Sequence, residues 1–467
     1  MKVSFSKIKI TPKNLDGVRM AGYARPDTCK GTLDDIFAHA TLILSSSENN
    51  NDKEKLLLIS IDILKFPISV ADYVKKKISE AFNDISYQNI LIHATHTHSA
   101  PDITGEFHWP GTSFLDVMKG IMFGINRNDE YVIWLSKKII KLVEKLNEGL
   151  KNCKIAWKKK QFNPNLVINR RHPSEIPKTD LGVISFRDLD NKLIGIIINY
   201  QCHPTTLSFF NNKLSADFPG RIIARISEMT QGQVKALYFN GAAGDLNPIT
   251  TCGTNYESLE IDKTPIYDQL GTYKHTRRLG YRIAEVVMKL TESIPNKEYY
   301  QELSFQSYIK VIFVPLKDPR YFSLAWLENK LYYLIKKYIL LSVVKVLYKK
   351  TNFPIFRLIK KGRTVGAQTI LQFIKFITKK EENRSEFSIF TVPGELFEKI
   401  GEKLIYQSPT GKDNSFIFQN SNDWIAYLFP LGEYIEIGGY EPVASFSPLS
   451  GYYVHKMMLE LFAEIKR

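Results

Sequence analysis

Short apolar runs recur along the chain, and turn residues follow most of them. The longest are KLLLISIDIL (55–64), NILIHAT (89–95), KLIGIIINYQ (192–201), VKALYFN (234–240) and FSIFTVPG (387–394). Runs of this length and composition predict buried strands. The amino-terminal stretch MKVSFSKIKI alternates apolar and polar residues instead, which predicts a strand with one buried face.

Helical periodicity fills several of the intervals between these runs. Residues 129–150 place Val132, Leu135, Ile139, Leu142 and Leu146 on one face, and residues 221–229 and 279–290 show similar spacing. Strands that alternate with helices predict an α/β fold, here a mixed-sheet sandwich with flanking helices. No internal repeat or low-complexity tract divides residues 1–467, so we expect a single domain.

Residues 317–363 interrupt this order and predict a helical, basic insertion. Between residues 329 and 363 there are ten Lys or Arg and no Asp or Glu, so much of the net charge of +15 is local. The insertion is either a helical lid with a solvated lysine face or a basic amphipathic helix that contacts an anionic membrane. Because the rest of the chain is only mildly basic, we expect no nucleic-acid partner.

Several absences indicate a cytoplasmic protein whose contact with a membrane is at most peripheral. The amino terminus lacks the apolar run of a signal peptide, and no stretch of roughly 18 apolar residues predicts a transmembrane helix. The four cysteines are far apart and form no CxxC pair, which favours reduced thiols.

The stretch HATHTHSAPD (93–102) concentrates three of the nine histidines at the end of a predicted strand. If the strand continued, His96 and His98 would share one face and could both approach a metal ion, whereas His93 would point into the core. Ligands bind at the carboxyl ends of strands in open α/β sheets. The alternative is a pair of solvated loop histidines.

Two further polar residues follow predicted strands and are therefore expected at the same sheet edge. His203 in CHPTTL precedes Pro204, and Glu395 in TVPGELF precedes a predicted helix. With His96 they form a His/His/Glu set that suits zinc with one open position. Taken singly, His203 could be a capped loop residue, and Glu395 could only stabilise the helix dipole. The loop NGAAGDLNP (240–248) would let the backbone approach a ligand closely.

These motifs together resemble the neutral/alkaline, non-lysosomal ceramidase family. The similar segments are AGYARPDT, DDIFAHATLI, ATHTHSAPD, INRRHP, CHPTTL, NGAAGDLNP, TVPGELF and YLFPLGEY…GGYEP. The resemblance implies a zinc amidohydrolase of lipid, notably sphingolipid, metabolism, acting on a lipid or other small molecule. It implies a Zn²⁺ site and an active site made by the following residues: His96, His203, Glu395 and Tyr427 as metal ligands, and His98, Arg170, Tyr440 and Asn247 around the substrate.

The chain also departs from the family pattern. Asn247 stands where ceramidases usually have a serine proposed to act on the substrate, so ceramide itself is not assured as the substrate. The carboxy-terminal immunoglobulin-like domain of the family is expected to be absent, as is its secretion signal. An N-acyl lipid, another amide and an ester therefore all stay open.

A mechanism without the serine is available. Zinc lowers the pKa of a bound water, which attacks the acyl carbonyl. His98 would then pass a proton to the leaving amine, while Arg170 or Tyr440 stabilises the oxyanion. The alternative is a non-catalytic homologue that kept the fold and binds a metal or a membrane. Zinc content, and turnover after the substitution His96→Ala, would separate these hypotheses.

Overall fold

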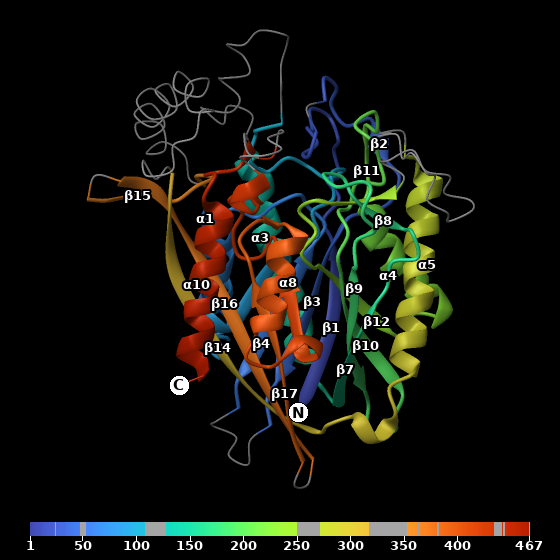
Figure 1. The fold of residues 1–467 in the computed structure, drawn as a ribbon. Helices are drawn as coiled ribbons and strands as arrows, with labels where there is room; N and C mark the ends of the chain where they lie inside the picture. The colour runs from blue at the N-terminus through green and yellow to red at the C-terminus, as the bar shows by residue number, and fades with distance from the viewer. Residues whose placement is uncertain are drawn as a thin grey trace.

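The structure is a computed structural model in which three β-sheets, each covered by helices, surround a shared core (Figure 1). It describes residues 1–23, 25–46, 53–107, 128–249, 271–316, 353–362, 364–380, 383–433, 441 and 444–466. The predicted mixed α/β fold is confirmed. Within these residues, no helix is both long and apolar enough to cross a membrane.

The first two sheets are mixed, with mainly antiparallel pairing and one parallel pair each. The first has the order β5-β4-β3-β1-β6, and its strands are β1 (Lys2–Lys9), β3 (Phe37–Leu44), β4 (Lys55–Ile61), β5 (Ile90–Ala94) and β6 (Lys151–Asn152). The second has the order β12-β10-β9-β7, and its strands are β7 (Lys154–Gln161), β9 (Asp180–Arg187), β10 (Leu193–Tyr200) and β12 (Lys235–Asn240). The parallel pairs are β4 with β5 and β10 with β12.

The third sheet comes from the second half of the chain, and three short strand pairs complete the fold. Its order is β14-β16-β17-β19, with β15 also on β16; the strands are β14 (Glu302–Pro315), β15 (Leu358–Lys361), β16 (Thr364–Lys380), β17 (Asn383–Thr391) and β19 (Ser415–Phe418). The short pairs are β2 (Gly31–Thr32) with β11 (Lys213–Leu214), β8 (Val167–Asn169) with β13 (Leu246–Pro248), and β18 (Glu395–Leu396) with β20 (Tyr427–Leu428).

Each sheet carries a pair of helices on its outer face. The pairs are α1 (Ile68–Ala81) with α3 (Asp129–Glu148), α4 (Asp217–Met229) with α5 (Tyr273–Glu292), and α8 (Glu398–Gln407) with α10 (Ser450–Lys466). Single 3₁₀ turns lie at Tyr87–Asn89, Asn296–Glu298 and Lys412–Asn414. Figure 1 shows α4 and α5 at the right of the molecule and α10 at the left.

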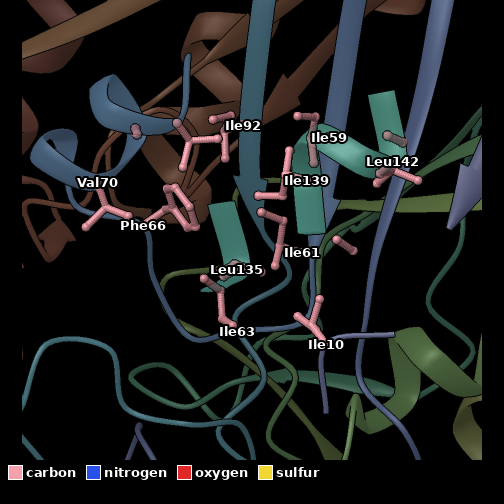
Figure 2. Packing of buried hydrophobic residues seen from close by; sticks show 14 of the residues in the cluster. Ile10, Ile59, Ile61, Ile63, Phe66, Val70, Ile92, Leu135, Ile139 and Leu142 are labelled. Atoms are coloured by element: carbon pink, nitrogen blue, oxygen red, sulfur yellow. The ribbon is translucent and has the colours of Figure 1, made fainter. Parts of the chain in front are cut away.

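Strand β4 is apolar from Leu56 to Ile61 except for Ser60, whose buried hydroxyl donates to Tyr238 O. Ile59 and Ile61 pack against Leu135 and Ile139 of α3, as Figure 2 shows, whereas Leu58 points to the opposite side. That opposite side is the central core, to which all three sheets contribute. A strand that is covered on both faces has no position for a solvated polar residue.

The carboxyl ends of β5, β10 and β17 approach one another, although these strands belong to three different sheets. Residues 419–423, just after β19, run beside β5: Asn422 N donates to Ile92 O at 2.7 Å and Ala94 N to Asn420 O at 3.1 Å. Asn420 N in turn donates to Gly394 O at 3.2 Å. This contact joins the first sheet to the third at the end of the molecule that also carries β2, β8 and β11 (Figure 1).

The end of the predicted helical insertion is not helical. Residues 317–352 and 363 lie outside the described residues, so the helical prediction for them stays a prediction. Leu358–Lys361, however, is strand β15: Lys361 pairs with Thr364 of β16, and Gly362, just after β15, has a φ of 58°. A tight turn with positive φ favours a hairpin.

Candidate active site

His96 enters the site from the loop after β5 and not from a strand. Strand β5 ends at Ala94, and His96 has a φ of 67°, a conformation that few non-glycine residues adopt. The prediction that His96 and His98 share a strand face is therefore wrong in its geometry. Ile63 O accepts the backbone N–H of His96 at 2.9 Å, and Leu64 O accepts its ring Nδ1–H at 2.6 Å. These contacts orient the ring so that Nε2 faces Glu395 Oε2.

His203 is oriented in the same manner from the second sheet. It follows β10, its backbone N–H donates to Leu246 O at 2.9 Å, and its Nδ1 lies 3.2 Å from Ala243 O. Burial lowers the pKa of His203 to about 3, with a smaller effect of His96. The imidazole is therefore neutral at pH 7, and its Nε2 lone pair is available for a metal.

Glu395 reaches the two histidines from the third sheet. Its Oε2 lies 3.3 Å from Nε2 of His96 and 3.7 Å from Nε2 of His203, and the side chain is almost fully buried. Burial alone would raise the pKa of Glu395, but the charge and hydrogen bond of His96 lower it to about 2. Helix α8 begins only at Glu398, so a helix-dipole role does not account for Glu395.

His98 completes the cluster from the loop after His96. Its Nε2 lies 3.2 Å from Nε2 of His203, and the ring of Tyr23 packs against it with centroids 4.7 Å apart. In contrast to the other two histidines, its buried Nδ1 has no hydrogen-bond partner among the described residues. Burial lowers the pKa of His98 well below its ordinary value, helped by the neighbouring His96 and His203.

These donors could hold a metal ion. One ring nitrogen from each of His96, His98 and His203 lies within 4.8 Å of the others, and all three residues are buried. Glu395 adds a buried carboxylate oxygen beside two of them. Imidazole nitrogens with a carboxylate are a common zinc ligand set, and backbone carbonyls that fix Nδ1–H are the usual outer partners of such ligands.

Close backbone packing around Glu395 explains the glycine-rich loop after β12. A Cβ on Gly244 would lie 2.4 Å from Glu395 O, and Gly244 N donates to Leu396 O at 2.7 Å. The loop was expected to approach a ligand, but Gly244 approaches the strand that carries the carboxylate. A side chain at this position would displace Glu395 from the histidines.

Arg170 is held by protein groups on three sides. Its Nε donates to Glu441 Oε1 at 3.0 Å, its Nη1 to Asn247 Oδ1 at 2.9 Å, and its Nη2 to Gly244 O. Asn247, at the position of the usual family serine, is thus oriented by Arg170. Arg171 binds Glu433 and also Glu441, each at 2.7 Å. The segment INRRHP therefore contacts both Glu433 and Glu441.

The structure places two of the remaining predicted residues. Tyr427 pairs with Glu395 in the β18–β20 ladder, so the two side chains leave the same face, and the Arg170 guanidinium lies 5.7 Å from the Tyr427 ring centroid. His93 is a core residue, as predicted: Nδ1 donates to Gln419 O at 2.8 Å and Nε2 accepts from Asn240 N at 3.3 Å. Tyr440 lies outside the described residues.

Sequence reasoning missed two residues that contact the site. Trp424 donates its indole Nε1–H to Glu395 Oε1 at 3.1 Å, and the Lys65 ammonium lies 3.8 Å from the centre of the Trp424 ring. Neither residue belongs to a motif that predicts chemistry. Only the unusual burial of a lysine, at 2% exposed, draws attention to Lys65, and burial is visible only in the folded chain.

Comparison with known proteins identifies the family of the chain and supports its fold. The sequence model described as neutral/alkaline non-lysosomal ceramidase, N-terminal, matches residues 2–258. Neutral ceramidase from Pseudomonas aeruginosa has a similar fold, with a TM-score of 0.71 at 16% identity over 100% of this chain and 74% of that one. A ceramidase complexed with C2 is similar to the same degree, with 15% identity over 100% of this chain and 75% of the other. The chain belongs to the neutral/alkaline non-lysosomal ceramidase family.

Proposed function

We propose that this chain is a zinc-dependent amidohydrolase that cleaves the N-acyl bond of a lipid-like substrate. The observation that carries the proposal is the meeting of Glu395 Oε2 with Nε2 of His96 and His203 in a buried place, with His98 beside them. Residues from three sheets converge there, which core packing alone does not require. Family membership supports amide hydrolysis as the reaction.

In the proposed hydrolysis the site residues have different roles. His96, His203 and Glu395 would hold the metal, with Tyr427 as a fourth candidate from the strand beside Glu395. When bound, zinc polarises an acyl carbonyl and lowers the pKa of water. His98 is neutral at pH 7 and can accept a proton at Nδ1 or Nε2, then release it to the leaving amine. Arg170 orients Asn247, whose amide N–H₂ is then the group that donates hydrogen bonds.

The proposal is tested by metal analysis and a substrate screen on the same preparation. We expect about one zinc per chain, and hydrolysis of N-acyl lipids that stops on chelation and returns with added zinc. The screen would compare ceramide with other N-acyl lipids and simple acyl esters, since Asn247 replaces the family serine. Zinc binding without turnover of any amide or ester would favour the non-catalytic homologue, and a chain without zinc would refute the proposal.

An exposed aromatic pair beside the site supports a lipid-like substrate. Phe209 and Phe210 are 37% and 66% exposed, and their rings pack together at 3.9 Å. Their loop is joined to the residue after His98, because Asn211 Nδ2 donates to Ser99 Oγ at 2.9 Å. The nearby Lys213 side chain is exposed. Apolar tips with basic neighbours favour contact with an anionic bilayer.

We therefore expect the double variant Phe209→Ser/Phe210→Ser to lose activity on substrate in vesicles. About a 100-fold loss of turnover at low substrate is expected, since each of the two rings would leave an apolar contact worth about 1.5 kcal/mol or more. Activity on a short-chain amide dissolved in water should not change. The control is Leu189→Ser, which removes an exposed apolar side chain elsewhere. Equal losses on the two substrates would contradict a membrane role for the pair.

A further inference from the structure

We infer that Trp424 and Lys65 are positioning residues that aim the Glu395 carboxylate at His96 and His203. The inference deepens the proposed function and rests on it. Glu395 has two oxygens with different partners: Oε1 accepts the indole N–H of Trp424, and Oε2 faces the two histidines. Because one oxygen is held, the other has a fixed direction.

Three hydrogen bonds position the backbone around Trp424 and Glu395. Asp423 Oδ1 accepts the N–H of Trp424 at 2.7 Å and the N–H of Ile68, the first residue of α1, at 2.8 Å. Two residues after Trp424, Ala426 O accepts Glu395 N–H at 3.0 Å. The indole and the carboxylate are thus tied to a common frame, and their contact does not depend on a flexible side chain alone.

Lys65 contacts the face of the same indole. Its ammonium lies over the ring at 3.8 Å and forms an ion pair with Glu106, and the Phe107 ring lies 5.1 Å away. A cation over an indole is attracted to the ring face and draws electron density from it, which makes the N–H a stronger donor. Successive contacts thus connect Glu106 to Lys65, Lys65 to Trp424, and Trp424 to the Glu395 carboxylate.

Residues 63–65, the segment that contains Lys65, also orient His96. Ile63 O and Leu64 O accept the backbone N–H and the ring Nδ1–H of His96, and Lys65 follows them directly. Residues 63–65 thus orient two candidate ligands. The carbonyls of Ile63 and Leu64 orient His96, and Lys65 acts on Glu395 through Trp424. Outer contacts of this kind change metal affinity by about 10- to 100-fold when they are removed from known metal sites.

The test is the affinity of the purified full-length chain for Zn²⁺ and Co²⁺, measured by competition with a chelator. Trp424→Phe keeps an aromatic ring under Lys65 but removes the N–H, and we expect it to weaken metal binding about tenfold. The Co²⁺ absorption bands should shift as well, because they report ligand geometry. A role in packing alone would change neither. Unchanged affinity and spectrum in Trp424→Phe would overturn the inference.

Two further variants keep the test decisive. Trp157→Phe is the matched control, since Trp157 donates its indole N–H to Asn414 at 2.7 Å in a part of the chain away from the site, and wild-type affinity is expected. The double variant Lys65→Met/Glu106→Gln keeps Trp424 and removes both charges. It can therefore be measured even if Trp424→Phe fails to fold, and we expect its metal affinity to fall about threefold. Wild-type affinity in this variant would overturn the role of Lys65. A wild-type chain that binds no metal would refute the proposed function instead.

Discussion

Glu395→Gln is expected to abolish tight zinc binding and, with it, hydrolysis. Glutamine has the size of glutamate and can still accept the Trp424 N–H, but it carries no charge to offset that of the metal. The loss of affinity should exceed about 100-fold, the upper end of what removal of an outer contact costs. Calorimetric titration of the metal-free chain with Zn²⁺, followed by an assay of turnover, measures both effects.

The buried carboxylate makes this a sharp test. In the metal-free chain, Glu395 is ionised at pH 7 because His96 keeps its pKa near 2 despite full burial. An ionised carboxylate in an apolar interior is costly unless a positive partner is present. Because His96 supplies that partner and lowers the pKa of Glu395 below its ordinary value, the metal-free Glu395→Gln variant should be less stable than the wild type at pH 7. Glu402→Gln on the exposed face of α8 should match the wild type in every measurement. Stoichiometric zinc in Glu395→Gln would show that the three histidines alone hold the metal.

The strands that lead to the site could be predicted because each is buried on both faces. Ile90–Ala94 and Leu193–Tyr200 were visible as apolar runs, and the polar residues just beyond them marked the sheet edge. His96, His203 and Glu395 were expected to meet at the edge of one sheet; they do meet, but the strands before them belong to three different sheets, so the expectation of a single sheet edge is wrong. The pairing register of the strands was not needed for this prediction, because only the positions of their carboxyl ends decide whether the three side chains meet.

What could not be predicted depends on contacts between distant segments. His96 has a positive φ in the loop after β5, and Ile63 O and Leu64 O, from the segment after β4, accept its backbone and ring N–H groups. Arg170 was expected to stabilise an oxyanion, but the structure surrounds its guanidinium with Glu441, Asn247 and Gly244 O, so a role in holding the site is better supported. No local pattern in the sequence specifies these partners.

The two candidate roles of His98 make different predictions. As a metal ligand, it would need its second ring nitrogen fixed, as Leu64 O and Ala243 O fix those of His96 and His203. Its Nδ1 instead has no hydrogen-bond partner among the described residues. A histidine that must take up and release a proton requires a nitrogen that is free to change its protonation state. This difference favours proton transfer over metal binding.

His98→Ala is therefore expected to keep its zinc and to lose turnover by about 1,000-fold, within the range that general acid–base catalysis contributes. The variant leaves space beside Tyr23, so added imidazole should restore part of the rate, and the restored rate should follow the fraction of neutral imidazole as pH changes. Zinc content and affinity serve as the control, because Glu395, His96 and His203 are untouched. If His98→Ala loses its zinc as Glu395→Gln does, His98 is a ligand, and the proton must be carried by a different group.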